Sequence, residues 1–148
     1  MRVTVQVAID GSNTAIWEAM TNIENTSKII TGIESIEILE KPMTGITGLK
    51  WRETRFYFGE LVTIEKQITE AVEKQFYKTR AESDGFLFLS TMTISEKNGV
   101  QTLISAHEYL PQGLTAKLKS LPMFLFKGVI KKALLKDLSA IKSFVERK

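Results

Sequence analysis

The chain has 148 residues, a formal net charge of +3 and no cysteine. This length fits one domain, residues 1–148, that is large enough to bury a core, and the lack of cysteine excludes disulfides and thiolate chemistry. A single histidine without cysteine does not suffice for a typical zinc or iron site, so we expect no metal and no cofactor.

The first expected element is a strand over residues 2–9, where valine and isoleucine occupy every second position. Ser12 predicts the start of a helix, because its hydroxyl can accept a hydrogen bond from a free backbone N–H. We expect this helix to extend through Met20. A second, short helix is expected over residues 25–30, ending near Gly32.

Six further strands are expected between residues 33 and 110, separated by turn-forming residues. The Asp84-Gly85 and Asn98-Gly99 pairs are strong hairpin signals, because both tolerate the positive φ angles of a type I′ turn. Strands joined by tight turns pair with each other, so this region predicts an antiparallel meander. The expected strands are residues 33–41, 48–58, 60–72, 75–83, 86–97 and 100–110.

Near the C-terminus the apolar residues change to a helical period. Seven of them between Met123 and Val145 follow steps of three and four, which predicts one long helix over residues 123–147 with a single apolar stripe. Pro122 is expected to start this helix, or to separate it from a shorter helix over residues 114–120.

Charge is concentrated in the same region. Residues 114–148 carry nine lysines and arginines against two acidic residues. This excess is typical of the solvated back of an amphipathic helix, and it is also compatible with a basic face that meets an anionic membrane or an acidic ligand.

These elements together predict an α+β fold in the order β-α-α-β6-α. A seven-stranded antiparallel sheet curves through its own twist, and a helix with one apolar stripe can cover the concave face. Because a helix with its side chains is only about 10–12 Å across, we expect space between sheet and helix that either side chains or a ligand must fill.

Several segments resemble the START-related helix-grip superfamily, also called SRPBCC, in its polyketide cyclase/dehydrase-like and lipid-transfer-like branch. The resemblance also extends to the birch pollen allergen family. It covers the whole chain, and the matching stretches are residues 15–20, 48–55, Glu65 with Ile68, and residues 132–142. It implies a helix-grip fold with a hydrophobic cavity between the sheet and the last helix. It carries no universal catalytic motif to transfer.

Two pairs of polar residues are candidates for chemistry. Glu53 and Arg55 share one face of a strand, either as a charged pair in the cavity or as a surface pair on the outer side. His107 and Glu108 are adjacent and point to opposite faces of a regular strand, so they cannot act as a dyad without a bulge. Glu108 is expected to face inward with Ile104 and Ala106, and His107 is a weak candidate for a general base.

Aromatic and apolar residues are expected to line the cavity, although each of them is also compatible with an ordinary core. The full set expected to contact a ligand is Trp51, Arg55, Tyr57, Tyr77, Phe86, Phe88, Met92, Glu108, Phe126 and Ile130.

The leading functional hypothesis is a carrier or sensor that binds an apolar or amphipathic small molecule, such as a lipid, a polyketide or an aromatic compound. The alternative is a cyclase or dehydrase that acts on a polyketide-like substrate, with Glu53, Arg55, Tyr57, His107 or Glu108 in the cavity. A third hypothesis is weak contact with a membrane surface through the basic helix face.

The remaining expectations concern partners and location. No phosphate-binding loop and no basic–aromatic strand surface is present, so nucleic acid is not expected as a partner. The protein is expected to be a monomer or a homodimer. The N-terminus lacks the apolar region of a signal peptide and no segment reaches the ~18 apolar residues of a membrane span, which together with the missing cysteine predicts a cytoplasmic location.

Overall fold

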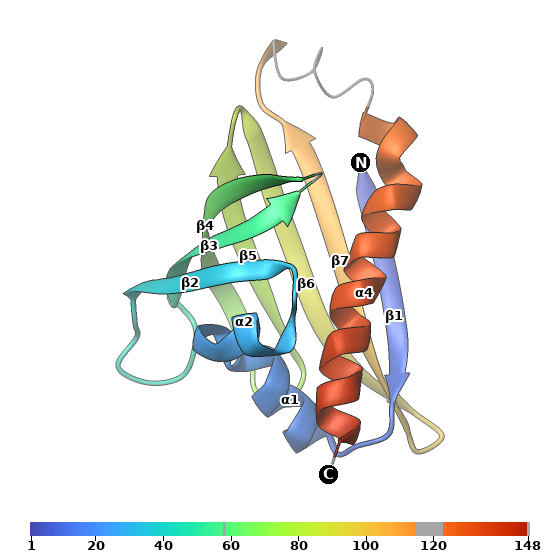
Figure 1. Ribbon diagram of the computed structural model, residues 1–148. Helices are drawn as coiled ribbons and strands as arrows, with labels where there is room; N and C mark the ends of the chain where they lie inside the picture. Colours follow the sequence, from blue (N-terminus) through green and yellow to red (C-terminus); the bar gives the residue numbers. More distant parts are fainter. Residues whose placement is uncertain (58, 115–122, 148) are drawn as a thin grey trace.

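The computed structural model describes residues 1–57, 59–114 and 123–147, and it consists of one curved sheet and a set of helices on its inner side (Figure 1). The strands are β1 (Arg2–Ile9), β2 (Ile33–Glu40), β3 (Lys50–Tyr57), β4 (Glu60–Val72), β5 (Phe76–Ser83), β6 (Phe86–Lys97) and β7 (Val100–Pro111). The helices are α1 (Asn13–Thr21), η1 (Ile23–Asn25), α2 (Thr26–Ile29), η2 (Met123–Phe126) and α4 (Lys127–Glu146).

The sheet has the order β1-β7-β6-β5-β4-β3-β2, and all neighbouring strands are antiparallel. Strands β2 to β7 therefore form the predicted meander, and β1 joins at the β7 edge. Both residues of each expected type I′ turn have positive φ angles, 50° and 77° at Asp84-Gly85 and 53° and 80° at Asn98-Gly99. Asp, Asn and Gly adopt this conformation at low cost, so the turn residues fix the strand register.

The short helices close one end of the arc. The Ser12 hydroxyl accepts a hydrogen bond from the backbone N–H of Ala15 at 3.1 Å, which confirms the predicted helix cap. Helix α1 buries Ile16, Trp17 and Met20 against the sheet. The hydroxyl of Tyr77 on β5 donates to the carbonyl of Met20 at 3.3 Å, so α1 is tied to the inner face.

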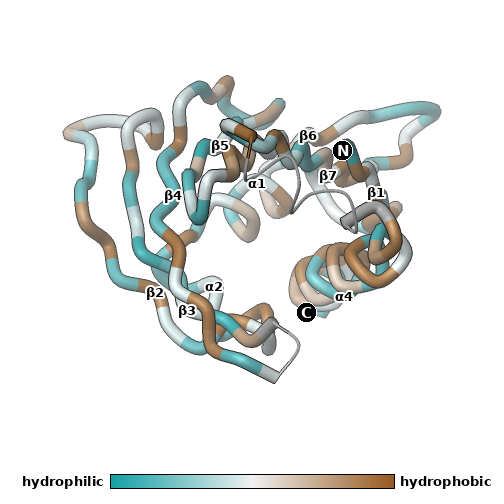
Figure 2. Tube along the Cα trace, turned by 90° about the horizontal axis from the view of Figure 1, so that it is seen from above, coloured by the Kyte–Doolittle hydropathy of each residue, from teal (hydrophilic) through white to brown (hydrophobic). Residues whose placement is uncertain are grey.

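Helix α4 lies between the two ends of the arc, as the view from above shows (Figure 2). Its C-terminal half buries Leu138, Ile141 and Val145 in the main core. That half is also held to the start of the fold, since the Lys142 ammonium donates to the carbonyl of Ala8 at 2.7 Å. The core therefore fills the end of the molecule where α1, β1 and the C-terminus of α4 meet.

The expected α+β helix-grip arrangement is confirmed, and most strand ends lie within two residues of the prediction. One boundary is wrong. The long helix is α-helical only from Lys127, because residues 123–126 form a turn of 3₁₀ helix instead. Apart from Leu114, the expected helix over residues 114–120 falls outside the described residues. Among the described helices, none is long and apolar enough to cross a membrane.

Candidate functional site

The inner face of the sheet carries residues in rows that cross several strands. Since side chains alternate along a strand, the buried Tyr77, Thr79 and Ala81 of β5 define this face. The strand register then places Met92, Ser90, Phe88 and Phe86 of β6 on the same face, followed by Ser105, His107 and Tyr109 of β7. On β3 the inner residues are Trp51, Glu53 and Arg55.

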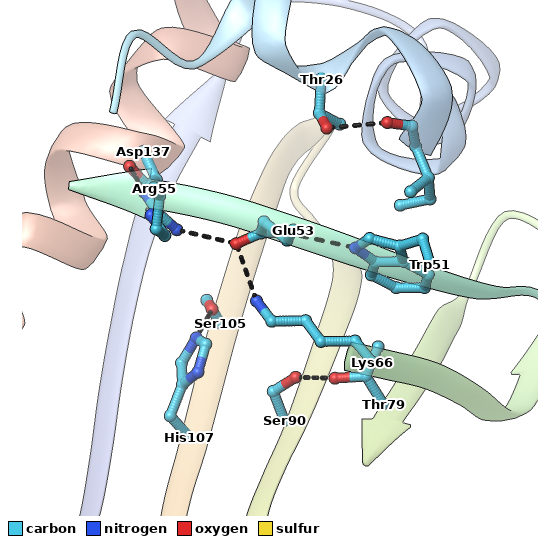
Figure 3. A network of polar contacts seen from close by, with 11 residues as sticks. Thr26, Trp51, Glu53, Arg55, Lys66, Thr79, Ser90, Ser105, His107 and Asp137 are labelled. Atoms are coloured by element: carbon cyan, nitrogen blue, oxygen red, sulfur yellow. Dashed lines mark hydrogen bonds and ion pairs between the residues drawn. The ribbon is translucent and has the colours of Figure 1, made fainter. Parts of the chain in front are cut away.

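Glu53 is the centre of a cluster of charged residues and is only 5% exposed. Its carboxylate accepts hydrogen bonds from the indole N–H of Trp51 at 3.3 Å and from the Lys66 ammonium at 3.1 Å (Figure 3). The Arg55 guanidinium lies 3.5 Å away. Three donors therefore satisfy a carboxylate that would be expensive to bury alone.

Arg55 extends this cluster to the helix. Its Nη2 donates to both carboxylate oxygens of Asp137 on α4, at 3.1 and 2.9 Å. Arg55 is thus held between Glu53 on its own strand and Asp137 on the helix (Figure 3). Two carboxylates and two cations, including Lys66, give the cluster no net charge.

A row of hydroxyls and one imidazole lies beside the charged cluster. Thr79, Ser90 and His107 are register partners on β5, β6 and β7, and the hydroxyls of Thr79 and Ser90 hydrogen-bond to each other. His107 Nε2 is hydrogen-bonded to the Ser105 hydroxyl at 2.6 Å. The charged cluster and this row together are called the polar belt (Figure 3). Its members are Glu53, Arg55, Lys66, Thr79, Ser90, Ser105, His107 and Asp137.

The electrostatic environment of this belt shifts several pKa values. Burial alone would raise the pKa of Glu53, but the charges of Lys66 and Arg55 hold it below its usual value. Burial raises the pKa of Asp137 despite Arg55 beside it. Burial, together with the positive charges of Lys66 and Arg55, lowers the pKa of His107 to about 4, so the imidazole is neutral at pH 7.

Tyr77 belongs to the core side of this belt. Burial and the negative charge of Glu53 raise the pKa of its hydroxyl above the usual value. The hydroxyl is therefore un-ionised at neutral pH and acts as a donor to the backbone of α1.

Beyond the polar belt, away from α1, the inner face is aromatic and only half buried. Phe88 packs edge-on against Tyr109, with ring centroids 5.6 Å apart, and Phe86 is 6.1 Å from Phe88. Neither Phe86 nor Phe88 belongs to the main core or packs against it. The stripe of α4 shows the same change, because Ile130 and Leu134 are half exposed whereas Leu138 is buried.

Most of the expected site residues lie on the inner face of the sheet, and Ile130 lies on the inward stripe of α4, with three exceptions. Glu108 lies on the outer face opposite Arg2, at an ion-pair distance of 4.0 Å, so its expected inward orientation is wrong. The alternation that places His107 inside forces Glu108 outside. Phe126 precedes α4 and is 49% exposed. The side chain of Tyr57 falls outside the described residues.

The sequence expectations missed five polar members of the belt. The position of each one along its strand or helix marks it as inward-facing, but only once the inner face of that strand or helix is known. Lys66 shares the inner face of β4 with Ile64 and Ile68, and Asp137 lies between Leu134 and Leu138 on the inward side of α4. The missed residues are Lys66, Thr79, Ser90, Ser105 and Asp137.

Two open hollows among the described residues lie away from the polar belt and from Phe86 and Phe88. One, of about 430 Å³, lies between α1 and the C-terminal end of α4. The other, of about 280 Å³, lies where β1 meets Lys142 and Glu146. The expected cavity under α4 stays a prediction; residues 115–122, which connect β7 to η2 in the sequence, lie outside the described part.

No model of a known protein family matches this sequence, and no curated protein sequence matches it. Solved structures do match over nearly the whole chain. An aromatase/cyclase, Zhui, from a Streptomyces species has 16% identity and a TM-score of 0.82, covering 99% of this chain and 94% of that one.

Two further structures have the same arrangement. A START superfamily protein from Mycobacterium smegmatis has 15% identity and a TM-score of 0.81, with 99% and 97% of the two chains covered. The major latex-like protein 151 of Panax ginseng has 12% identity and a TM-score of 0.75, with the same coverage. At these identities the likeness concerns the fold alone, and this chain therefore has the same helix-grip fold as these three proteins.

Proposed function

We propose that this protein binds an apolar or amphipathic small molecule on the inner face of its sheet, beneath the N-terminal half of α4. One observation carries the proposal. The apolar side chains of Phe86 and Phe88 on the sheet, and of Ile130 on the helix, are directed inward but are only partly buried. A folded protein gains free energy by covering such surface, and a ligand of matching shape supplies the cover.

The polar belt supports a ligand with an uncharged polar end. The two carboxylates of the cluster are balanced by Lys66 and Arg55, so no net charge is left to attract an ion. The Lys66 ammonium has three N–H donors and uses one of them on Glu53. Carbonyl or hydroxyl oxygens of a lipid, polyketide or aromatic compound suit the other two, with the apolar part against Phe88.

The structural neighbours support the same class of function. Proteins with this fold include one described as an aromatase/cyclase and one described as a START superfamily protein. As parts of the proposal we retain a cytoplasmic location, a monomeric or homodimeric state and the absence of nucleic acid as a partner. The first rests on the lack of cysteine and of a membrane-spanning helix among the described residues.

Thermal unfolding with a panel of uncharged amphipathic compounds, such as naphthols and fatty alcohols, tests the proposal. A ligand that binds only the folded state raises the melting temperature in a saturable way. Phe88→Ala should weaken binding about tenfold or more. The matched control is Phe76→Ala, which removes a half-buried phenylalanine from the outer face of β5 and should leave affinity unchanged.

If no compound in the panel stabilises the protein, or if Phe76→Ala and Phe88→Ala weaken binding equally, the inner face is not the ligand site. Circular dichroism of each variant checks that it is folded, so that a loss of affinity is not confused with a loss of structure.

A second candidate function is favoured by the convergence of ionisable residues. Glu53, Arg55, His107 and Asp137 all belong to the inner face or the helix that covers it. In a dehydration of a β-hydroxy carbonyl compound, a base removes the proton next to the carbonyl, an acid protonates the departing hydroxyl, and water leaves. Neutral His107 is the candidate base, and Asp137, whose pKa is raised by burial, is the candidate acid.

This enzymatic candidate ranks second because an imidazole with a pKa of about 4 is a weak base at pH 7. It is tested by following the absorbance of the conjugated product from a β-hydroxy ketone. Turnover that His107→Gln and Asp137→Asn each abolish establishes the enzyme. The absence of turnover in the native protein rejects it and leaves ligand binding unaffected.

A further inference from the structure

The start of α4 exposes large apolar side chains, which is unusual for the surface of a helix in water. Leu125 is 71% exposed, Phe126 49% and Val129 51%. All three lie within one and a half turns, just before and inside the first turn of α4. Exposed apolar side chains gathered in this way mark a surface that meets something other than water.

Four lysines surround these apolar residues. Lys127, Lys131, Lys132 and Lys136 are all exposed, and none forms an ion pair with any carboxylate in residues 1–57, 59–114 and 123–147. The nearest acidic residue on the helix is Asp137, whose charge is already matched by Arg55. The first ten residues of α4 therefore present uncompensated positive charge.

Apolar and basic residues share one side of the helix. Leu125, Val129, Lys132 and Lys136 follow steps of four, three and four, which places them on one face. The inward stripe of Ile130, Leu134 and Leu138 is offset from it. This outward face is separate from the inner face of the sheet, so it is independent of the proposed ligand site.

We propose that this face docks on an anionic lipid surface, with Leu125, Phe126 and Val129 inserted at the headgroup level. We call it the docking face: Leu125, Phe126, Val129, Lys132 and Lys136. An interfacial helix binds through apolar residues in the outer part of the bilayer and lysines against anionic headgroups. The complementary charge favours a lipid surface, and the described helices include none that spans a membrane.

Cosedimentation of the full chain with vesicles tests the proposal. Vesicles of phosphatidylcholine with phosphatidylserine are compared with vesicles of phosphatidylcholine alone, at low salt and near physiological ionic strength (~0.15 M). Binding should require phosphatidylserine and weaken with salt. The double variant Lys132→Glu with Lys136→Glu should lower vesicle affinity about tenfold or more, and Val129→Glu should lower it to a similar degree.

The chain offers a matched control for each change. Val100 is 50% exposed in β7, next to the β6–β7 turn at the opposite end of the molecule from η2 (Figure 1). Val100→Glu adds the same charge as Val129→Glu and should leave vesicle affinity within twofold. Lys41→Glu with Lys97→Glu matches the charge change of the double lysine variant at sites outside α4.

Three outcomes overturn the proposal: no binding to vesicles that contain phosphatidylserine at low salt, equal loss in the docking-face variants and their controls, or a dimer in sedimentation equilibrium that Val129→Glu dissociates without any vesicle binding. The last result assigns the docking face to a second copy of the chain. All variants are solvent-exposed substitutions, and thermal unfolding checks that each one is folded.

Discussion

Arg55 on β3 and Asp137 on α4 are 82 positions apart in the sequence and form an ion pair of 2.9 Å. Both side chains are largely buried, which makes the pair stronger than a surface salt bridge and sensitive to the loss of either partner. The pair connects the β3 end of the arc to the helix, whereas Lys142 connects the helix to β1 at the opposite edge.

A double-mutant cycle measures this connection. Arg55→Met and Asp137→Leu should each destabilise the protein, and the double variant should be less destabilised than the sum, with a coupling free energy of about 1–3 kcal/mol. Urea unfolding of the four proteins gives the values. A coupling near zero would mean that the pair does not hold the helix to β3.

Substitution of Glu53 should lower the free energy of unfolding more than substitution of any surface glutamate. Glu53→Ala leaves Lys66, Arg55 and the Trp51 indole without their shared acceptor, and we expect a loss of about 3–5 kcal/mol in the free energy of unfolding. Glu53→Gln should cost less, because the amide oxygen still accepts a hydrogen bond.

Glu37→Gln is the control for Glu53. It also neutralises a glutamate paired with an arginine, Arg52 at 3.0 Å, but on the outer face, where we expect a change within about 0.5 kcal/mol. Equal losses at Glu37 and Glu53 would contradict the central position of Glu53. Chemical denaturation followed by tryptophan fluorescence provides the comparison.

His107 should make the folded state sensitive to mild acid. Its pKa is about 4 when folded and 6.5 when unfolded, so between these values the unfolded chain binds more protons. Stability is complete above pH 6.5 and falls as the pH drops toward 4, by about 2 kcal/mol between pH 7 and pH 5. Asp137 has the opposite effect on stability. Because burial raises its pKa in the folded state, its contribution to stability decreases as the pH rises above its usual pKa.

His107→Gln separates these contributions, since glutamine removes the titration and can keep a hydrogen bond to Ser105. In this variant the free energy of unfolding should decrease much less between pH 7 and pH 5 than in the native protein. NMR titration of the native protein should find the imidazole neutral at pH 6. The contribution of Glu53 is lost only at lower pH, since its folded pKa lies below the usual value of 4.5. An unchanged pH profile would argue against a buried neutral His107.

Gly11 allows the chain to turn beneath the end of α4. A Cβ atom at this position would lie 2.7 Å from Cγ1 of the buried Val145. Gly11→Ala should therefore cost about 1–3 kcal/mol, and Val145→Ala in the same chain should recover part of the loss. Gly128→Ala in α4 meets nothing within 4 Å and should be neutral or stabilising. Thermal unfolding gives the melting temperature of each variant. A lower melting temperature for Gly128→Ala than for Gly11→Ala would contradict the close approach of Gly11 to Val145.

The strands and their order could be predicted from the sequence because turn chemistry and alternation are local signals. Asp84-Gly85 and Asn98-Gly99 fix two hairpins without any knowledge of the core. The faces were harder, because β6 is apolar on both sides and β7 contains no long run of alternation near His107. Glu108 is expected inside because it shares a face with Ile104 and Ala106, whereas the register with β1 and the inward His107 beside it place it outside.

The charged cluster could be predicted only in part. Glu53 and Arg55 are two positions apart and share a face in any extended strand. Lys66 and Asp137 come from a neighbouring strand and from a helix 82 positions after Arg55, so their meeting depends on register and on packing of α4. No local pattern in the sequence contains that information.

Methionine-methyl NMR tests the central claim most directly, because the chain contains a reporter on the inner face and a control on the surface. Met92 faces inward on β6, and Met43 is fully exposed in the loop between β2 and β3. Titration with a compound that stabilises the protein should shift the Met92 methyl resonance saturably and leave Met43 in place. Binding that shifts Met43 and not Met92 would contradict a ligand site under α4.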